Sequence, residues 1–309
     1  MAATSNRESD MTNAATPRYP ARWLARAVGV VRLLATVAGG LAVAPGCAAV
    51  TPRVHTAAAA STRMSVWTVN LHGSSLELHV ARPVSDLPPG SFVLYASGDG
   101  GGFGAAVEMF RTIAANGYPT VGFSSRAFLK LERPAHAALN ARQLAADYAA
   151  ILSEGRRVLG LPPETAVILT GWSRGAALAM IAASEPALSG HTRGVVAIGL
   201  SPDEDLAVTG DGDEDNGGPV AGASMAHAPF DLYDRLRQAH PWRCAVIQSS
   251  GDSYLPAAGA RLRFGADTPD RRLYTVQARN HRFSGGQREL GAALLGAIAW
   301  VDQLLPDGQ

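Results

Sequence analysis

Cysteine and lysine are scarce in this chain of 309 residues, and its formal charges almost cancel. With 2 cysteines and no Cys-x-x-Cys pair, the sequence excludes a disulfide-rich scaffold and shows no structural metal site. The net charge of +1 gives no reason to expect a nucleic-acid partner. Lys130 is the only lysine, so no glycine-rich loop ends in the Gly-Lys-Ser/Thr of a phosphate-binding loop. We therefore expect no cofactor.

No apolar run near the N-terminus is long enough for a comfortable membrane span. Leu33–Ala44 follows several arginines and has the length of the apolar region of a signal peptide. We therefore expect export, with residues 1–49 as the targeting segment and 50–62 as a linker. Ala44-Pro-Gly-Cys47 is an imperfect lipobox. Lipidation at Cys47, cleavage near residues 44–49 and a retained anchor all stay open.

Ala166–Met180 is the most informative segment of the chain. An apolar run leads into Gly171-Trp172-Ser173-Arg174-Gly175, and small residues in a helical pattern follow. A strand, a sharp turn and a helix in this order form a nucleophile elbow with the serine at its apex. Glycines suit the two flanking positions because the serine backbone is strained and neighbouring side chains would clash. The alternative is a tight packing turn without chemistry.

A catalytic triad on such a scaffold needs a later acid and then a histidine near the C-terminus. The apolar strand 243–250 ends in Gly251-Asp252, and the strand 272–276 is followed by a loop with His281. We expect His281 to take the proton of Ser173 and Asp252 to orient and stabilise the imidazole. Asp203 is the main rival acid. Of 8 histidines, His281 alone lies in the last strand-to-helix loop, and His136 and His227 stay open as pocket residues.

The strand 91–96 is followed by the glycine-rich loop Ser97–Gly104. Such a loop lets backbone N–H groups point at a developing negative charge. We expect an oxyanion hole made by the N–H of Gly100 or Gly101 and the N–H of Arg174. The side chains of Asp99, Trp172 and Arg174 are the candidates for substrate contact, and Arg174 suits a phosphate or a carboxylate.

Strands alternate with helices along the rest of the chain. We expect strands at 65–71, 76–80, 91–96, 120–124, 166–170, 194–200, 244–248 and 273–276, and helices at 105–116, 139–157, 175–184, 230–238 and 286–305. Ser284 is a candidate cap of the last helix. This alternation predicts an α/β-hydrolase fold over residues 63–309, with a doubly wound, mainly parallel sheet, helices on both faces and function at the carboxyl ends of the strands.

Two further features have simple interpretations. Residues 201–222 combine many carboxylates with glycine, which predicts a solvated loop insertion. The alternatives are attraction of a cationic headgroup and a calcium loop at Asp211-x-Asp213-x-Asp215, which lacks a glutamate at its twelfth position, Gly222. Cys244 lies on an apolar strand and is expected to be a small core residue.

Three motifs together resemble the VirJ/AcvB-type virulence-associated α/β hydrolases of Gram-negative bacteria. They are Ser97-Gly-Asp-Gly-Gly101, Gly171-Trp-Ser-Arg-Gly175 and Asn280-His-Arg-Phe283. The resemblance covers roughly residues 91 to 286. It implies a periplasmic serine hydrolase, with Ser173, Asp252 and His281 as the triad and Gly98 to Gly101 as the oxyanion loop. It also implies an aminoacylated phosphatidylglycerol, a membrane phospholipid, as the ester substrate. Contact of the protein itself with a membrane surface would come from lipidation at Cys47.

The chain departs from this family at three points. Gly102 stands where a tryptophan is usual, the elbow reads Trp-Ser-Arg in place of Tyr-Ser-Phe, and Cys244 has no cysteine partner near the acid strand. These departures bear on the substrate and not on the mechanism. Two alternatives therefore stay open: a carboxylesterase or dienelactone-hydrolase-like enzyme acting on a soluble ester, and a non-catalytic binding module associated with secretion.

Overall fold

The computed structural model describes residues 62–83, 90–99, 106–131, 139–206, 229–238 and 240–303. All of them belong to one compact unit, His55–Gln309. Several expectations fall outside the described residues: the targeting segment with Cys47, the loop glycines Gly100 and Gly101, the histidines His136 and His227, and the acidic residues 211–215. Among the described helices, none is both long enough and apolar enough to cross a bilayer.

An eight-stranded sheet forms the centre of this unit, in the order β1-β2-β4-β3-β5-β6-β9-β10. The strands are β1 (Thr62–Leu71), β2 (Ser74–Pro83), β3 (Ser91–Ala96), β4 (Thr120–Phe123), β5 (Ala166–Trp172), β6 (Thr192–Ile198), β9 (Arg243–Ser249) and β10 (Arg271–Val276). β2 pairs antiparallel with β1 and β4, and all other neighbours are parallel. The predicted mainly parallel sheet is therefore confirmed.

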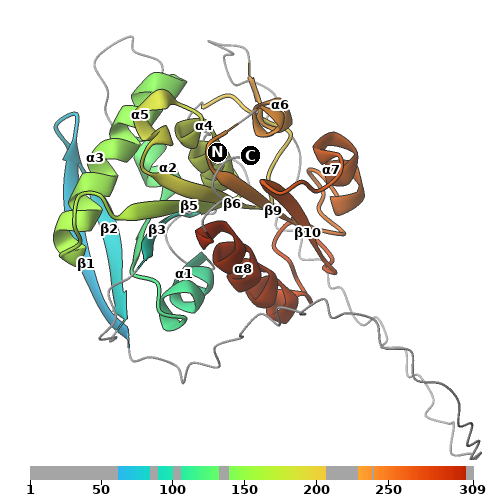
Figure 1. Cartoon of the computed structure of the whole chain (residues 1–309), viewed down its shortest axis with the longest axis horizontal. Coiled ribbons are helices and arrows are strands. Elements are labelled where there is room, and N and C mark those ends of the chain that lie inside the picture. Colours follow the sequence, from blue (N-terminus) through green and yellow to red (C-terminus); the bar gives the residue numbers. More distant parts are fainter. Residues whose placement is uncertain are drawn as a thin grey trace, which may run out of the picture. The chain divides into compact units, whose positions relative to one another are not determined.

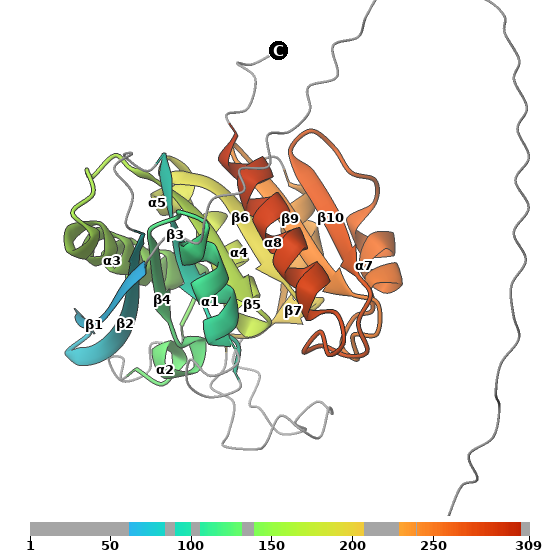
Figure 2. The same ribbon diagram turned by 90° about the horizontal axis from the view of Figure 1, so that it is seen from below.

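Helices cover both faces of the sheet, as Figures 1 and 2 show. They are α1 (Ala106–Ala115), α2 (Ser125–Leu129), α3 (Ala141–Leu159), α4 (Arg174–Ala183), α5 (Pro186–Ser189), α6 (Leu232–Arg237), α7 (Ala257–Phe264) and α8 (Gln287–Asp302). α1 and α8 pack on one face, while α3 and α4 pack on the other. A separate two-stranded ladder joins β7 (Asp203–Glu204) to β8 (Phe230–Asp231).

The burial of each strand follows its place in the sheet. All six residues of β3 and all seven of β9 are buried, because helices cover the central strands on both sides. The outermost strand β1 is different, since Met64, Val66 and Trp67 are exposed on it. The structure thus places the hairpin expected from the first two strands at the edge of the sheet, with its outer strand partly exposed.

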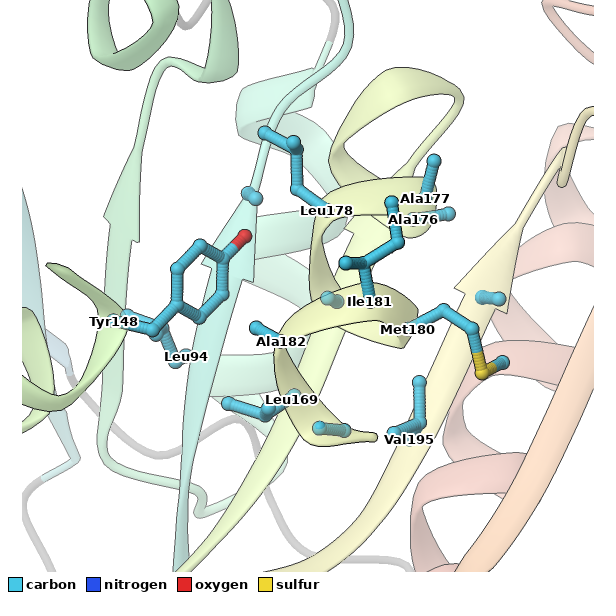
Figure 3. Packing of buried hydrophobic residues seen from close by; sticks show 14 of the residues in the cluster. Leu94, Tyr148, Leu169, Ala176, Ala177, Leu178, Met180, Ile181, Ala182 and Val195 are labelled. Atoms are coloured by element: carbon cyan, nitrogen blue, oxygen red, sulfur yellow. The ribbon is translucent and has the colours of Figure 1, made fainter. Parts of the chain in front are cut away.

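Helix α4 fixes the centre of the structure, and every one of its residues is buried. Figure 3 shows Ala177, Ile181 and Ala182 of this helix in one packed cluster with Leu169 of β5 and Tyr148 of α3. Small residues bring the helix close to the strands, most tightly at Gly175. A side chain there would collide with the carbonyl oxygen of Ala96 at the end of β3. The helix start, and with it the preceding residue, is therefore locked against the sheet.

Several details differ from the sequence-based expectation, and the short helices α2 and α5 are among the elements that were not predicted. Helix α8 begins at Gln287 after Gly286, so the expected cap at Ser284 is wrong. Ser284 instead donates its N–H to the side chain of Asn280, at 3.1 Å, within the preceding loop. The helix α7 and the short ladder of β7 and β8 were not predicted, because α7 has no apolar stripe of its own and a two-residue strand leaves no periodic pattern.

Candidate active site

Ser173 stands at the apex of a sharp turn between β5 and α4. Its backbone has a φ of 54°, in the left-handed region that residues other than glycine rarely adopt. A side chain at Gly171 would collide with the backbone of Gly175, so both glycines are required by close approach. The turn therefore has the geometry of a nucleophile elbow, in which backbone strain holds the serine away from both elements that flank it.

Asp252 lies in the loop after β9 and is buried, with 2% of its surface exposed. Its Oδ1 accepts the backbone N–H of Tyr254 at 2.9 Å and that of Leu255 at 3.4 Å. Its Oδ2 accepts the side-chain amide of Gln248 at 3.1 Å and faces Nδ1 of His281 at 2.7 Å. Such a set of donors fixes the direction of the carboxylate.

His281 lies in the loop after β10, which is tied to the loop that carries Asp252. Gly251 donates its N–H to the carbonyl of Ala278 at 3.0 Å, and the hydroxyl of Ser250 accepts the N–H of Ala278 at 3.1 Å. A side chain at Gly251 would come within 2.6 Å of the carbonyl oxygen of Arg279. Backbone contact between the two loops thus sets the position of the imidazole relative to the acid.

The imidazole of His281 lies against the residue that follows β6, and the end of β6 is hydrogen-bonded to the elbow. Ser173 donates its N–H to the carbonyl of Ile198 at 2.7 Å. The next residue, Gly199, has a φ of +60°, and a Cβ there would lie 2.9 Å from Cε1 of His281. The opposite nitrogen of the ring, Nε2, is buried and has no hydrogen-bond partner among the described residues. In the tautomer whose Nδ1–H donates to Asp252, Nε2 is the nitrogen that can accept a serine proton.

The rival acid Asp203 lies elsewhere. It belongs to β7, its side chain is exposed, and the carboxylate bonded to His281 is that of Asp252. Trp172, expected at the substrate pocket, packs its ring against Phe283 of the histidine loop, with ring centroids 5.7 Å apart. Trp172 therefore joins the elbow to the histidine loop, and its contact with substrate stays a prediction.

The described part of the expected oxyanion loop lies against the nucleophile. A Cβ at Gly98 would be 3.3 Å from both Cβ of Ser173 and the carbonyl oxygen of Trp172. Arg174 is the first residue of α4, a position whose N–H has no acceptor within the helix. Gly100 and Gly101 lie outside the described residues, so their role stays a prediction.

The guanidinium of Arg174 faces carboxylates of the protein itself. It pairs with Asp99 at 2.9 Å, Glu204 at 3.0 Å and Asp205 at 3.4 Å. The expectation of a solvated loop is wrong at Glu204, which is buried because it satisfies this guanidinium. Sequence reasoning placed Asp99 and Arg174 at the site but gave no signal that they form a pair, or that Glu204 joins them. The described residues contain no group of three or more side chains suited to a metal ion.

Comparison with known proteins places the architecture of this chain. No family model and no curated protein matches its sequence. Solved structures do match: the esterase Est1E from Butyrivibrio proteoclasticus has a TM-score of 0.55 at 11% identity, over 77% of this chain and 99% of that one. A putative dienelactone hydrolase from Klebsiella pneumoniae has a TM-score of 0.55 at 12% identity, over 79% and 99%.

A serine hydrolase without a lid from Xanthomonas campestris has a TM-score of 0.50 at 16% identity, over 80% of this chain and 97% of that one. This chain therefore spans almost the whole length of these proteins. The likeness, together with the observed sheet, confirms the α/β-hydrolase fold.

Proposed function

We propose that this protein is a serine hydrolase that cleaves carboxylic esters. One observation carries the proposal: a buried acid, Asp252, bonds the imidazole of His281 at 2.7 Å, and that ring lies against Gly199, next to the residue whose carbonyl accepts the N–H of the strained Ser173. The three groups follow β5, β9 and β10, so they meet at the carboxyl edge of the sheet, where open α/β sheets place their function. The likeness to solved esterases supports the same chemistry.

The reaction proceeds by acyl transfer in two halves. Oγ of Ser173 attacks the ester carbonyl while Nε2 of His281 takes the hydroxyl proton, and the negative charge of the tetrahedral intermediate falls on the carbonyl oxygen. Collapse expels the alcohol, which receives the proton from His281. Water then attacks the acyl-enzyme in the same way, the acid is released and Ser173 regains its proton. Asp252 holds the ring and stabilises it while it is charged.

Backbone N–H groups are the best candidates for the donors that stabilise the oxyanion. The N–H of Arg174 lies at the start of α4, where the helix dipole also favours negative charge. The loop after β3 passes beside Ser173 at Gly98, and we assign the second donor to Gly100 or Gly101 of the same loop. Each such donor is typically worth about 10²- to 10³-fold in kcat.

For the substrate, we propose an aminoacylated phosphatidylglycerol. The resemblance of the glycine loop, the elbow and the histidine loop to VirJ/AcvB-type hydrolases supports this choice. Charge supports it as well: the three carboxylates of Asp99, Glu204 and Asp205 outnumber the guanidinium groups of Arg174 and Arg126 that act on this cluster. Negative charge at this place would attract the ammonium group of an aminoacyl ester.

A soluble ester is the second candidate substrate. The structurally similar proteins include a putative dienelactone hydrolase, whose name indicates a small ester substrate, and a serine hydrolase without a lid. A non-catalytic binding module associated with secretion is the third possibility. It predicts that Ser173 does not react with a fluorophosphonate. Both enzyme proposals require that Ser173 does react.

We also propose that the protein is exported to the periplasm. The basic and apolar N-terminal segment and the lipobox-like Ala44–Cys47 support this. Fractionation of the producing cells, followed by mass spectrometry of the mature N-terminus, tests it. A diacylglycerol adduct on Cys47 would show anchoring, a new N-terminus near residues 44–49 without lipid would show cleavage, and an intact cytoplasmic chain would refute export.

The first experiment measures amino-acid release from lysyl- and alanyl-phosphatidylglycerol in mixed micelles by the full-length chain. Ser173→Ala is the matched control. Release that requires Ser173 supports both nucleophile and lipid substrate. Hydrolysis of p-nitrophenyl esters without release from lipid would replace the lipid by a soluble ester. No hydrolysis and no Ser173-dependent fluorophosphonate labelling would refute the enzyme.

A further inference from the structure

Arg174 holds together three segments that are far apart in the sequence. Its Nη1 donates to Oδ2 of Asp99 at 2.9 Å, 75 residues away in the loop after β3. Its Nε donates to both carboxylate oxygens of Glu204 at 3.2 Å, and Nη2 donates to Oε1 of the same residue at 3.0 Å, 30 residues away in β7. Nη2 also reaches Oδ1 of Asp205 at 3.4 Å. Each guanidinium nitrogen thus donates to a carboxylate.

Glu204 is the deepest member of this cluster. It is 7% exposed and Arg174 is 8% exposed, whereas the neighbouring Asp203 is exposed to solvent. The Oε1 atom of Glu204 also accepts the N–H of Leu206 at 2.9 Å. Burial of a carboxylate is costly unless donors surround it, and here the planar guanidinium supplies them in a fixed fork.

Burial changes the pKa of both carboxyl groups that Arg174 binds most closely. It raises the pKa of Asp99 and the pKa of Glu204, and the attraction of Arg174 offsets part of the effect in each. A charged cluster kept at this cost does not improve stability over an apolar packing of the same volume. The hydrogen bonds of the guanidinium have fixed directions, however, and these specify how the joined segments lie relative to each other.

Two of the segments joined by this cluster lie next to the proposed nucleophile. Arg174 follows Ser173 directly, and Asp99 follows Gly98, whose backbone lies against Ser173 and Trp172. The Asp99–Arg174 pair therefore sets the distance between the start of α4 and the loop after β3. These are the two elements to which the proposed function assigns the oxyanion donors.

We propose that Arg174, anchored by Glu204, is a positioning residue that fixes the beginning of the loop after β3, residues 97–99, against the nucleophile through Asp99. The inference rests on the proposed hydrolase function and replaces a substrate-contact role for this guanidinium. Glu204 acts at one remove: it holds Arg174, Arg174 holds Asp99, and Asp99 holds the loop. Loss of Glu204 should then harm the transition state and leave binding of the ground-state ester almost unchanged.

The test compares Glu204→Gln with Asp203→Asn in the full-length chain. Both remove one carboxylate from β7, but only the first removes a partner of Arg174. We expect Glu204→Gln to lower kcat for p-nitrophenyl acetate about 10- to 100-fold with KM changed by less than about threefold, because a misplaced donor costs rate. Affinity for an alkyl boronic acid, which mimics the tetrahedral intermediate at Ser173, should fall by the same factor. Asp203→Asn should match the wild type in all three quantities.

Asp99→Asn provides the second variant, since it weakens the same network at the loop end without touching Glu204. It should lower kcat and boronate affinity in parallel, again with KM nearly constant. If kcat and boronate affinity of Glu204→Gln equal those of Asp203→Asn, the positioning role is refuted while the hydrolase stands. If Glu204→Gln is unfolded by circular dichroism, an unchanged kcat of Asp99→Asn refutes it instead. A wild-type chain that neither hydrolyses the ester nor is labelled by a fluorophosphonate would refute the proposed function, and this inference with it.

Discussion

Nδ1 of His281 lies 2.7 Å from Oδ2 of Asp252, across 29 residues of sequence that form α7 and β10. The carboxylate is buried, and the ring of His281 makes an edge contact with the ring of Tyr254, with centroids 4.8 Å apart. A contact of this length between an acid and an imidazole fixes the tautomer of the histidine and leaves Nε2 to work as a base. It is the relationship on which the proposed chemistry depends most directly.

Asp252→Asn should lower kcat far more than Asp203→Asn. Loss of the acid in a serine triad leaves the imidazole in the wrong tautomer, and the cost is on the order of 10⁴-fold. Asp203 is exposed and does not bond His281, so its variant should retain the wild-type rate. Steady-state hydrolysis of a p-nitrophenyl ester measures both. A larger loss in the Asp203 variant would show that the acid has been assigned to the wrong residue.

Gly199→Ala should displace the imidazole and lower kcat about tenfold or more. A methyl group there would meet Cε1 of His281 at 2.9 Å. Gly160→Ala is the matched control, because Gly160 also has a positive φ, +69° against +60°, but a methyl group at Gly160 would have no atom within 4 Å.

Both alanine variants should lose about 1–2 kcal/mol of unfolding free energy from backbone strain. Only Gly199→Ala should lose activity in the folded state. Urea unfolding and ester hydrolysis on the same samples separate the two effects. Equal activity of the two variants would mean that the ring moves aside without consequence.

Glu204 should make the protein less stable as the pH rises through its titration range. Burial raises the pKa of Glu204 above its ordinary value of 4.5. In that window the folded chain keeps a proton that the unfolded chain has released, so the free energy of unfolding falls with rising pH. Glu204→Gln should flatten this decline, although the contribution of Asp99, whose pKa is also raised, remains.

Urea titrations at a series of pH values from 4.5 upward measure the slope. The exposed Glu164→Gln provides a control that should leave the slope unchanged. A Glu204→Gln slope equal to that of the wild type would show that the carboxylate does not carry a raised pKa in the folded chain.

Cys244 should be unreactive in the folded protein. It is 2% exposed on β9, and burial raises the pKa of its thiol, so the reactive thiolate is rare. Iodoacetamide followed by peptide mass spectrometry should find Cys244 unmodified under native conditions and alkylated in guanidinium. Rapid alkylation of the native protein would indicate that β9 opens locally.

The sequence predicted the helices and strands that have a periodic pattern of apolar residues, and the structure confirms several of them closely. β3 occupies Ser91–Ala96 as expected, and the expected helix 139–157 is observed as α3, Ala141–Leu159. Both follow from the spacing of apolar residues over one element. The elbow was equally accessible, because glycines at fixed offsets around Ser173 leave a short motif.

The rest of the site depends on contacts between distant segments, and no local pattern encodes them. Glu204 sits in a stretch of carboxylates and glycines that reads as solvated, yet its pairing with Arg174 buries it. Gly199 falls inside the expected strand 194–200, and a glycine within a strand pattern can mark a close approach. The neighbour of Gly199 is the ring of His281, and only the assembled sheet shows this contact.

Gly175 has one more consequence, which concerns the order in which the molecule matures. Its backbone fits against the carbonyl of Ala96 only once β3 lies beside β5, and the left-handed turn at Ser173 is held by that fit. A chain whose central strands have not yet paired therefore has a serine but no elbow. Reactivity of Ser173 toward a fluorophosphonate should appear late during refolding, after secondary structure has formed, which makes the nucleophile a built-in reporter of the completed native state.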